Sequence, residues 1–351
     1  MNISSRSILP ETEIPIVIIG AGGIVKDAHL PAYAKAGFKV LGIYDIEKKN
    51  AELLARKFEV PQICDTIEEL IELGIKNKAV FDVAVPAAEI IPILSVLPDN
   101  AAVLIQKPMG ENLMEAEKIL SLCRQKELVA AINFQLRYAP FVNAARTIID
   151  SGAIGDVYDM EVKLCAFTPW HLWDFLTKTP RVEILYHSIH YIDLVRSILG
   201  DPDRVMAKTV RHPTTTVAQT KSTVIMDYGD TISATIITNH DHDFGPRHQQ
   251  SYIKWEGTKG VIYARMGLLL DYPNGVSDEF EYGIKDVNGN TEWKTVDLKG
   301  SWFPDAFIGT MGSLMRFMEG SEMELPTSVE DAIKTMEAVE NAYMSSNGNL
   351  R

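Results

Sequence analysis

The chain has 351 residues, a length typical of two domains, and its 46% hydrophobic and 23% charged residues exclude a largely disordered protein. Lys and Arg number 34 against 47 Asp and Glu, and the net charge of −13 argues against binding to nucleic acid or anionic membranes. Three cysteines without metal-type spacing argue against a disulfide framework and a zinc ribbon, so they favour a reducing cytoplasm.

The first residues, MNISSRSILPETE, are polar and lack the basic and apolar segments of a signal peptide. The most apolar stretch, residues 79–97, is interrupted by Asp82, Pro86, Glu89 and Pro92, and no run reaches the ~18 apolar residues of a spanning helix. We therefore expect no membrane-spanning segment and a cytoplasmic protein.

The first third of the chain alternates short β-rich runs with helical patterns. The runs are IVIIG, KVLGIYD, FDVAVP, AVLIQKP and LVAAINF. Asn112, followed three residues later by Glu115, resembles a capping box that starts one of the intervening helices. This rhythm predicts a parallel, doubly wound α/β sheet with helices on both faces, and we place this domain at residues 1–136.

A glycine-rich turn follows the first strand. Gly20, Gly22 and Gly23 lie between that strand and a helical stretch, with Val25 where a third motif glycine would stand. Gly20 permits a tight turn, and Gly22 lets backbone N–H groups approach a pyrophosphate. Asp45 ends the second strand, where a carboxylate binds the hydroxyls of an adenosine ribose. The combination predicts a dinucleotide-binding Rossmann domain.

The predicted cofactor is NAD, because the Asp45 carboxylate would repel the 2′-phosphate of NADP. Lys48 and Lys49 stand close enough to Asp45 that NADP binding stays an open alternative. Ile24, beside the glycine turn, and Pro86, after a further strand, complete the predicted cofactor contacts.

From Val157 onward the pattern changes to longer β-like runs. It contains one clear internal helix, at about residues 183–199, and a last helix at about 329–344. Asn288-Gly289 indicates a hairpin. We therefore expect a second, α+β domain at residues 137–351 with a mostly antiparallel sheet, whose long runs carry apolar positions that favour self-association.

Six segments in order resemble the Gfo/Idh/MocA family of sugar and cyclitol oxidoreductases. This resemblance implies an open-faced second sheet that often forms a dimer interface, and a last helix that packs back on the first domain. It also implies a homodimer or homotetramer. The segments are GAGGI with AHLPAY, LIQKPMG, SGAIGDV, HSIHYIDLVRSILG, GTKG and SVEDAIKTMEAVENAY.

Lys107 matches the catalytic lysine of this family, at the carboxyl end of a predicted parallel strand, where ligands of such sheets bind. The resemblance also implies a cis Lys107–Pro108 bond, which would direct the lysine into the cleft, and a contact of Lys107 with the cofactor. Gln106 departs from the glutamate that usually precedes the lysine.

His190 matches the histidine of the family's D-x-x-x-H-x-x-D pattern, and Asp193 matches its last acid. The first acid is replaced by Tyr186. By their spacing the three residues share one helix face, so the Tyr186 phenol could take the hydrogen-bonding role of the acid without its charge. His187 is the alternative replacement and a candidate substrate contact.

Two further segments provide candidate substrate contacts. Asn133, Gln135 and Arg137 follow a predicted strand, and their spacing of two places them on one face of an extended segment. They are either substrate contacts or parts of a linker. Trp170, His171 and Trp173 suit a sugar-like ligand, with aromatic packing on the sheet as the equal alternative.

His240, His242 and His248 have the alternate spacing of a strand-borne metal site. The segment also contains Gly245-Pro246, and the hydride chemistry of the resembled family needs no metal, so we predict none. Arg247 could instead bind an anionic group of a substrate.

These features predict a cytoplasmic NAD-dependent dehydrogenase that transfers hydride between nicotinamide and a secondary alcohol or carbonyl of a sugar, cyclitol or sugar acid. Lys107 would polarise the oxygen, His190 would act as general acid and base, and Tyr186 would orient or relay, all in one cleft. A dinucleotide- and sugar-sensing protein without turnover is the alternative. Internal recycling of tightly held NAD is a third possibility.

Overall fold

The computed structural model describes residues 3–172 and 174–348. Its contacts divide the chain into two compact units. The parallel-sheet unit comprises Ser7–Tyr138 and Phe303–Met336. The mixed-sheet unit comprises Met1–Arg6, Ala139–Trp302 and Glu337–Arg351.

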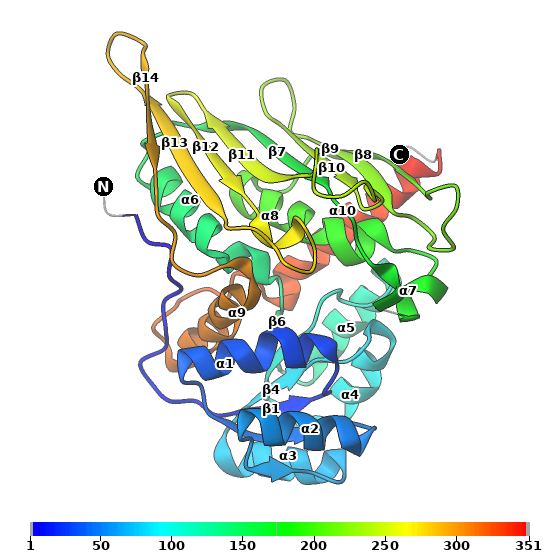
Figure 1. The fold of residues 1–351 in the computed structure, drawn as a ribbon. Coiled ribbons are helices and arrows are strands. Elements are labelled where there is room, and N and C mark those ends of the chain that lie inside the picture. Colours follow the sequence, from blue (N-terminus) through cyan, green and yellow to red (C-terminus); the bar gives the residue numbers. More distant parts are fainter. Residues whose placement is uncertain (1–2, 173, 349–351) are drawn as a thin grey trace. The chain divides into compact units, whose positions relative to one another are not determined.

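The parallel-sheet unit contains a six-stranded sheet in the order β3-β2-β1-β4-β5-β6 (Figure 1). Every pair of neighbouring strands is parallel. The strands are β1 (Ile16–Ile19), β2 (Val40–Tyr44), β3 (Gln62–Ile63), β4 (Val80–Val83), β5 (Ala102–Ile105) and β6 (Val129–Ile132). This order is that of a doubly wound dinucleotide-binding sheet, which confirms the predicted α/β Rossmann class.

Helices connect these strands and cover both faces of the sheet. The Asn112 side chain accepts a hydrogen bond from the Glu115 N–H at 3.0 Å, which confirms the predicted helix start. The helical elements are η1 (Val25–His29), α1 (Leu30–Ala36), α2 (Lys48–Phe58), α3 (Ile67–Asn77), η2 (Ala87–Glu89), α4 (Ile90–Val96), α5 (Leu113–Gln125), η3 (Gln135–Tyr138) and α9 (Trp302–Glu319), whose first residue belongs to the mixed-sheet unit.

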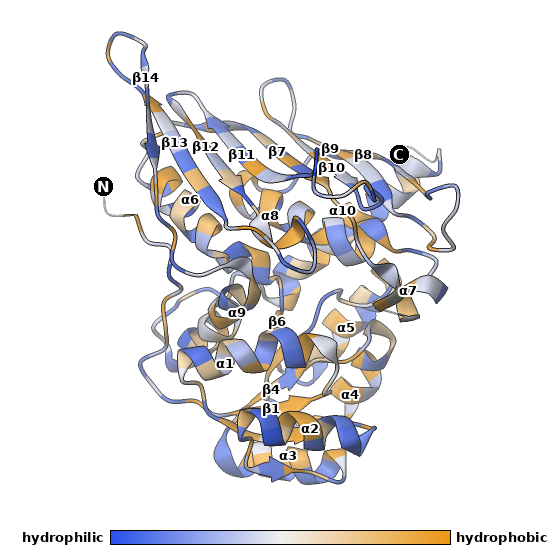
Figure 2. Ribbon diagram, in the orientation of Figure 1, coloured by the Kyte–Doolittle hydropathy of each residue, from blue (hydrophilic) through white to orange (hydrophobic). Residues whose placement is uncertain are grey.

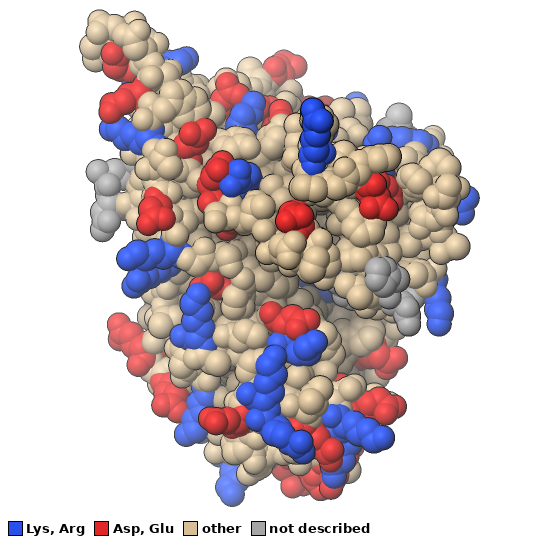
Figure 3. Space-filling view, viewed as in Figure 1, with Lys and Arg blue, Asp and Glu red and all other residues tan. Residues whose placement is uncertain are grey.

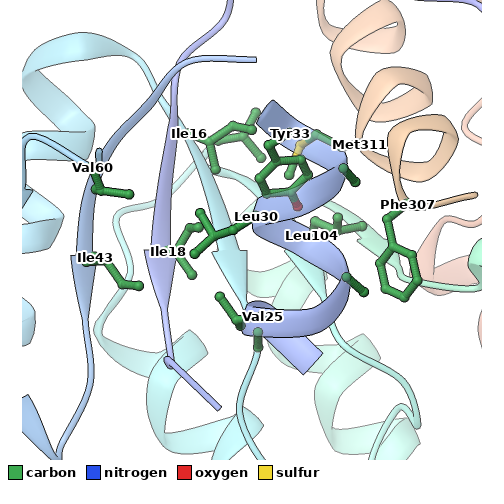
Figure 4. Packing of buried hydrophobic residues seen from close by; sticks show 14 of the residues in the cluster. Ile16, Ile18, Val25, Leu30, Tyr33, Ile43, Val60, Leu104, Phe307 and Met311 are labelled. Atoms are coloured by element: carbon green, nitrogen blue, oxygen red, sulfur yellow. The ribbon is translucent and has the colours of Figure 1, made fainter. Parts of the chain in front are cut away.

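The core of this unit follows from strands that are buried on both faces. Figure 2 shows the hydrophobic colour on the central strands β1 and β4. Ile16 and Ile18 face one cluster, to which α1 contributes Tyr33 and α9 contributes Phe307 (Figure 4). Val17, on the alternate face, lies near Gly74 of α3. The apolar strands are thus held between two helical layers.

The mixed-sheet unit contains an eight-stranded sheet in the order β14-β13-β12-β11-β7-β10-β9-β8. The β10 and β7 strands pair in parallel, and the other neighbours are antiparallel, as predicted. The strands are β7 (Val157–Cys165), β8 (Arg204–Val210), β9 (Lys221–Asp227), β10 (Ser233–Asn239), β11 (Gln250–Gly257), β12 (Gly260–Arg265), β13 (Glu279–Lys285) and β14 (Thr291–Thr295). The predicted hairpin at Asn288-Gly289 joins β13 to β14.

Helices of this unit pack on one face of that sheet (Figure 1). Along β11, buried and partly exposed residues alternate, so the strand has one inner and one outer face. The helical elements are α6 (Pro140–Asp150), η4 (Trp170–Leu172), α7 (Asp174–Lys178), η5 (Glu183–Ser188), α8 (Ile189–Leu199), η6 (Gly267–Leu269) and α10 (Val329–Ser346). The first eight residues of α10 belong to the parallel-sheet unit, and the rest to this one.

Two helical predictions need correction. The predicted helix at 183–199 begins as a π-helix, η5, and becomes α-helical only at Ile189. Helix α9 was not predicted, because Gly309 and Gly312 weaken its helical pattern. A Cβ at Gly309 would lie 2.3 Å from the Cβ of Tyr138, so close packing requires glycine there. No helix in residues 3–172 and 174–348 is long and apolar enough to cross a membrane.

Candidate cofactor and catalytic site

The glycine turn after β1 approaches the end of β4 closely. Gly20 has a φ of +102°, and a Cβ there would lie 2.3 Å from the backbone oxygen of Ala84. No atom lies within 4 Å of the Cβ positions of Gly22 and Gly23, so their backbone is open where η1 begins. An L side chain is therefore excluded at Gly20, and a pyrophosphate fits the open backbone beside Gly22.

Asp45 follows β2 and is held against this turn. Its Oδ2 accepts a hydrogen bond from the Ala21 N–H at 2.6 Å, and its Oδ1 accepts one from the Glu47 N–H at 2.8 Å. The carboxylate is therefore held beside the glycine turn, and its contact with a ribose stays a prediction. Ile24 is partly exposed beside the turn, and the exposed Pro86 precedes η2 just after β4. These positions fit a dinucleotide at the carboxyl edge of the sheet.

Lys48, which raised the alternative of NADP, forms an exposed ion pair with Asp65. Hydrogen bonding and charge attraction from Asp65 raise the pKa of Lys48. Lys48 thus already has an acidic partner, whereas Lys49 is exposed beside it.

Lys107 follows β5, and the Lys107–Pro108 peptide bond is cis, as the resemblance implied. The residue is partly exposed by surface area, yet its ammonium is surrounded densely enough for burial to lower its pKa to about 8. A desolvated ammonium at the carboxyl end of a parallel strand is suited to bind and polarise a substrate oxygen.

A buried polar network lies at the same edge of the sheet. His29 Nδ1 is 2.7 Å from Asp82 Oδ2, and the Tyr33 hydroxyl donates to the same oxygen at 2.7 Å. All three side chains are almost fully buried. Burial, followed by the charge of Asp82 and its hydrogen bond, raises the pKa of Tyr33. The Oδ2 atom of Asp82 is therefore shared by the His29 ring of η1 and the Tyr33 hydroxyl of α1.

Gln106 connects this network to the lysine segment. Its Oε1 accepts a hydrogen bond from Asn133 Nδ2 at 3.0 Å and lies 3.3 Å from His29 Nε2. The Thr310 hydroxyl in turn donates to Asn133 Oδ1 at 2.8 Å. Asn133, predicted as a substrate contact, thus joins the ends of β5 and β6 to α9. His29 and Asp82 were missed in the sequence, where an acid inside the apolar run FDVAVP is the available signal.

The expectation that Asn133, Gln135 and Arg137 share one face of an extended segment is wrong. Residues 135–138 form the 3₁₀-helix η3, in which residues two apart point in different directions. Gln135 Oε1 accepts from the Leu136 N–H at 2.8 Å. Arg137 pairs with Asp331 at 2.5 Å, so its charge is neutralised within the unit.

His190 and Tyr186, the predicted catalytic residues of the mixed-sheet unit, have different ring neighbours. His190 is buried, and its ring centroid lies 5.9 Å from that of Trp302. Tyr186 is partly exposed, and its ring lies 5.6 Å from Phe175. Tyr186 also packs against an apolar cluster that includes Trp170. Asp193 is fully buried.

His187 and Trp170, two predicted substrate contacts, lie together. Their ring centroids are 5.1 Å apart and nearly perpendicular. Both also contact His240, at 4.6 Å from His187 and 5.3 Å from Trp170. His240 Nε2 lies 3.4 Å from Glu183 Oε1 in a fully buried pair. Glu183 was not predicted, since it lies in an apolar segment and its partner is far along the chain.

The three histidines considered for a metal site have different surroundings. His242 Nε2 lies 2.8 Å from the Arg247 backbone oxygen, and the exposed His248 has a left-handed backbone. Within the described part of the chain, no group of three His, Cys, Asp or Glu side chains could hold a metal ion. Trp173 and the side chain of His171 lie outside the described residues.

Charged side chains of both signs are interspersed on the face drawn in Figure 3. The ion pairs Lys48–Asp65 and Lys26–Asp27 are examples from the parallel-sheet unit. These two cations are thus accompanied by nearby carboxylates.

The strand order and the glycine turn are those of a dinucleotide-binding Rossmann domain. Residues 14–134 match the model of the oxidoreductase family with an NAD-binding Rossmann fold, and residues 142–263 match the GFO/IDH/MocA C-terminal domain. The chain belongs to the Gfo/Idh/MocA oxidoreductase family. This confirms the resemblance, and NAD is the cofactor that the family model specifies.

Curated relatives include sugar dehydrogenases. The chain is 23% identical to a D-apiose dehydrogenase of Rhizobium rhizogenes over 252 residues, which are 69% of each chain. It is 28% identical to the glucose-6-phosphate 3-dehydrogenase of Bacillus subtilis over 148 residues, 42% of this chain and 41% of the relative.

Solved structures share the fold along nearly the whole chain. An oxidoreductase from Agrobacterium radiobacter, in complex with NAD+, L-tartaric acid and magnesium, superposes with a TM-score of 0.79 at 20% identity, covering 96% of this chain and 97% of that one. A super-repressor mutant of Gal80p from Saccharomyces cerevisiae has the same TM-score at 13% identity, with 96% of both chains covered.

Proposed function

We propose that this member of the family is an NAD-dependent dehydrogenase that oxidises a secondary alcohol of a sugar, cyclitol or sugar acid, or reduces the corresponding carbonyl. The observation that carries the proposal is the edge of the parallel sheet, where Asp45 is fixed beside the open glycine turn and Lys107 presents a desolvated ammonium. The dehydrogenase relatives act on sugars according to their names, which supports this substrate class.

In this proposal NAD, bound by the glycine turn and Asp45, supplies the hydride acceptor. The Lys107 ammonium binds the substrate oxygen and stabilises negative charge on it. His190 accepts the hydroxyl proton during oxidation and returns it during reduction. Because the side chain of Lys107 is desolvated, its positive charge acts on the oxygen with little screening by water.

The test is NADH formation with a panel of sugars, cyclitols and sugar acids. Lys107→Met and His190→Asn should each lower turnover by about 10²- to 10⁴-fold, the range for a lost acid–base group, with NAD affinity within about twofold of the unmodified protein. Wild-type turnover with unchanged rates in both variants would contradict the proposed roles.

The alternative is a sensor that binds dinucleotide and sugar without turnover. It is supported by Tyr186, which replaces a charged group by a phenol, and by the fold shared with the Gal80p mutant. A sensor predicts ligand binding without NADH formation on any member of the panel. The presence of both Lys107 and His190 favours the enzyme.

We also propose that the chain self-associates as a homodimer or homotetramer through the outer face of the mixed sheet. Ile225 is 38% exposed there, and the Tyr252 and Tyr263 rings lie 5.3 Å apart on neighbouring strands. Sedimentation at micromolar concentration tests this proposal, and a stable monomer would contradict it.

A further inference from the structure

The resembled pattern has an acid where this chain has Tyr186, yet a buried carboxylate lies three residues earlier. Glu183 is fully buried in the first turn of η5. Its Oε1 accepts a hydrogen bond from the Ser188 hydroxyl at 2.8 Å and lies 3.4 Å from His240 Nε2. The mixed-sheet unit therefore keeps a negative charge beside this segment, displaced from position 186.

The charge of Glu183 is stabilised where it lies. Burial raises the pKa of Glu183, but hydrogen bonding and charge attraction from His240, with hydrogen bonds from Ser222 and Ser188, outweigh this effect, so the net pKa is lowered. Burial, followed by the charge of Glu183, also raises the pKa values of Tyr191 and Tyr343. Both phenols are therefore neutral neighbours of an ionised carboxylate.

His240 links Glu183 to a group of three rings. Its Nε2 faces Glu183, and its Nδ1 lies 2.8 Å from the Thr168 hydroxyl, so both ring nitrogens have polar neighbours. The ring centroids of His240 and His187 lie 4.6 Å apart. The Trp170 ring contacts both, at 5.3 Å from His240 and 5.1 Å from His187. Of the three rings, those of His240 and Trp170 are buried, and that of His187 is partly exposed.

Trp170 supplies a second indication of a ligand at these rings. The residue is 8% exposed, and its indole Nε1 has no hydrogen-bond partner among the described residues. A buried indole N–H without a partner costs free energy unless a ligand or water completes it. An aromatic wall with a hydrogen-bond donor and an imidazole is suited to a polyhydroxylated ligand.

We propose that Glu183, His240 and His187 form one unit that replaces the missing acid at position 186. In this unit His187 hydrogen-bonds a hydroxyl of the sugar-like substrate. Glu183 and His240 are positioning residues, because Glu183 holds the His240 ring and the His240 ring packs against that of His187. Trp170 forms the adjoining wall. The inference rests on the proposed dehydrogenase function for its substrate class. The coupling of the three residues does not depend on a substrate and can be measured without one.

The kinetic test uses His187→Asn, the near-isosteric Glu183→Gln, and the double variant, with NAD and the best substrate of the panel. His187→Asn removes the proposed hydrogen bond to the substrate, and Glu183→Gln removes the charge that holds His240. Each single variant should therefore lose about 10- to 100-fold in kcat/KM. Because Glu183 acts through His187, the double variant should be no slower than His187→Asn. Additive losses would contradict the coupling, and a loss below threefold in His187→Asn would overturn the role of His187.

The matched control is Glu340→Gln. Glu340 is a partly buried carboxylate of the mixed-sheet unit, but it pairs with Arg181 at 2.6 Å and 2.9 Å rather than with a histidine. We expect its kcat/KM to stay within about twofold of the unmodified protein. An equal loss in Glu340→Gln and Glu183→Gln would assign the effect to general destabilisation and refute the proposal.

A second measurement does not need turnover. In the ¹⁵N-histidine-labelled protein, the pH titration of the His187 ring is followed by NMR, with His187→Asn for assignment. Loss of the Glu183 charge disfavours the imidazolium, so Glu183→Gln should lower the His187 midpoint, while Glu340→Gln should not. If no substrate is turned over, the proposed function fails and this shift alone supports the unit. An unchanged midpoint overturns the unit in either case.

Discussion

Replacing Asp45 by Asn separates a structural from a cofactor-binding role of its carboxylate. The two carboxylate oxygens accept from different N–H groups, Ala21 at 2.6 Å and Glu47 at 2.8 Å. An Asn side chain has one acceptor oxygen and can keep only one of these bonds. Since a hydrogen bond to a charged group contributes about 1.5–3 kcal/mol, Asp45→Asn should lower the free energy of unfolding by this amount.

The effect on cofactor binding is a separate quantity. In the proposed complex the ribose hydroxyls donate to the carboxylate, and loss of one such bond should weaken NAD binding by about 10- to 100-fold. NADP should lose less, because its 2′-phosphate is no longer repelled. Titration calorimetry with both nucleotides measures the affinities, and urea unfolding measures the stability.

The control is Asp99→Asn. Asp99 is an exposed partner of Lys126 in the same unit, and its removal should change stability by less than about 1 kcal/mol and leave both affinities unchanged. If Asp45→Asn lowers stability but keeps NAD affinity within twofold, Asp45 only stabilises the loop by its hydrogen bonds, and its assignment to the ribose is wrong.

The other predictions concern the lysine, the turn and the buried network. The kcat/KM of the enzyme should fall as the pH rises through about 8, because the Lys107 ammonium loses its proton there, and a profile flat through this region would contradict its role. Gly20→Ala should lower the thermal unfolding temperature, since the added Cβ would lie 2.3 Å from a backbone oxygen. Gly22→Ala should leave the stability of the protein unchanged but weaken NAD binding in calorimetry. Asp82→Asn should lower the free energy of unfolding in urea by about 1–3 kcal/mol, because a neutral amide replaces the buried acceptor that His29 and Tyr33 share, and an unchanged stability would refute this.

Features set by neighbouring residues could be predicted from the sequence. The glycine turn, the alternation of apolar runs and the Asn288-Gly289 hairpin each depend on a few adjacent positions. They sufficed for both sheets and for the positions of Asp45 and Lys107. Helix α9 escaped prediction because its two glycines serve contacts with distant segments.

The polar contacts at the site could not be predicted in this way, because they join residues far apart in sequence. His29 and Gln106 are separated by 77 positions, and Arg137 and Asp331 by 194. The spacing of two predicted that Arg137 shares a face with Asn133 and Gln135. Its position is instead determined by the 3₁₀-helix η3 and by the distant carboxylate of Asp331. The π-helical turn before His190 likewise has no local sequence signal, since its residues would also fit an α-helix.

The central claim, that the chain oxidises a sugar-like alcohol with NAD, is tested most directly by NADH formation during a single turnover with saturating NAD and the substrate panel. We expect NADH with at least one sugar, cyclitol or sugar acid, and its loss in Lys107→Met. Saturable binding of both NAD and a sugar without any NADH would contradict it and identify the protein as a sensor.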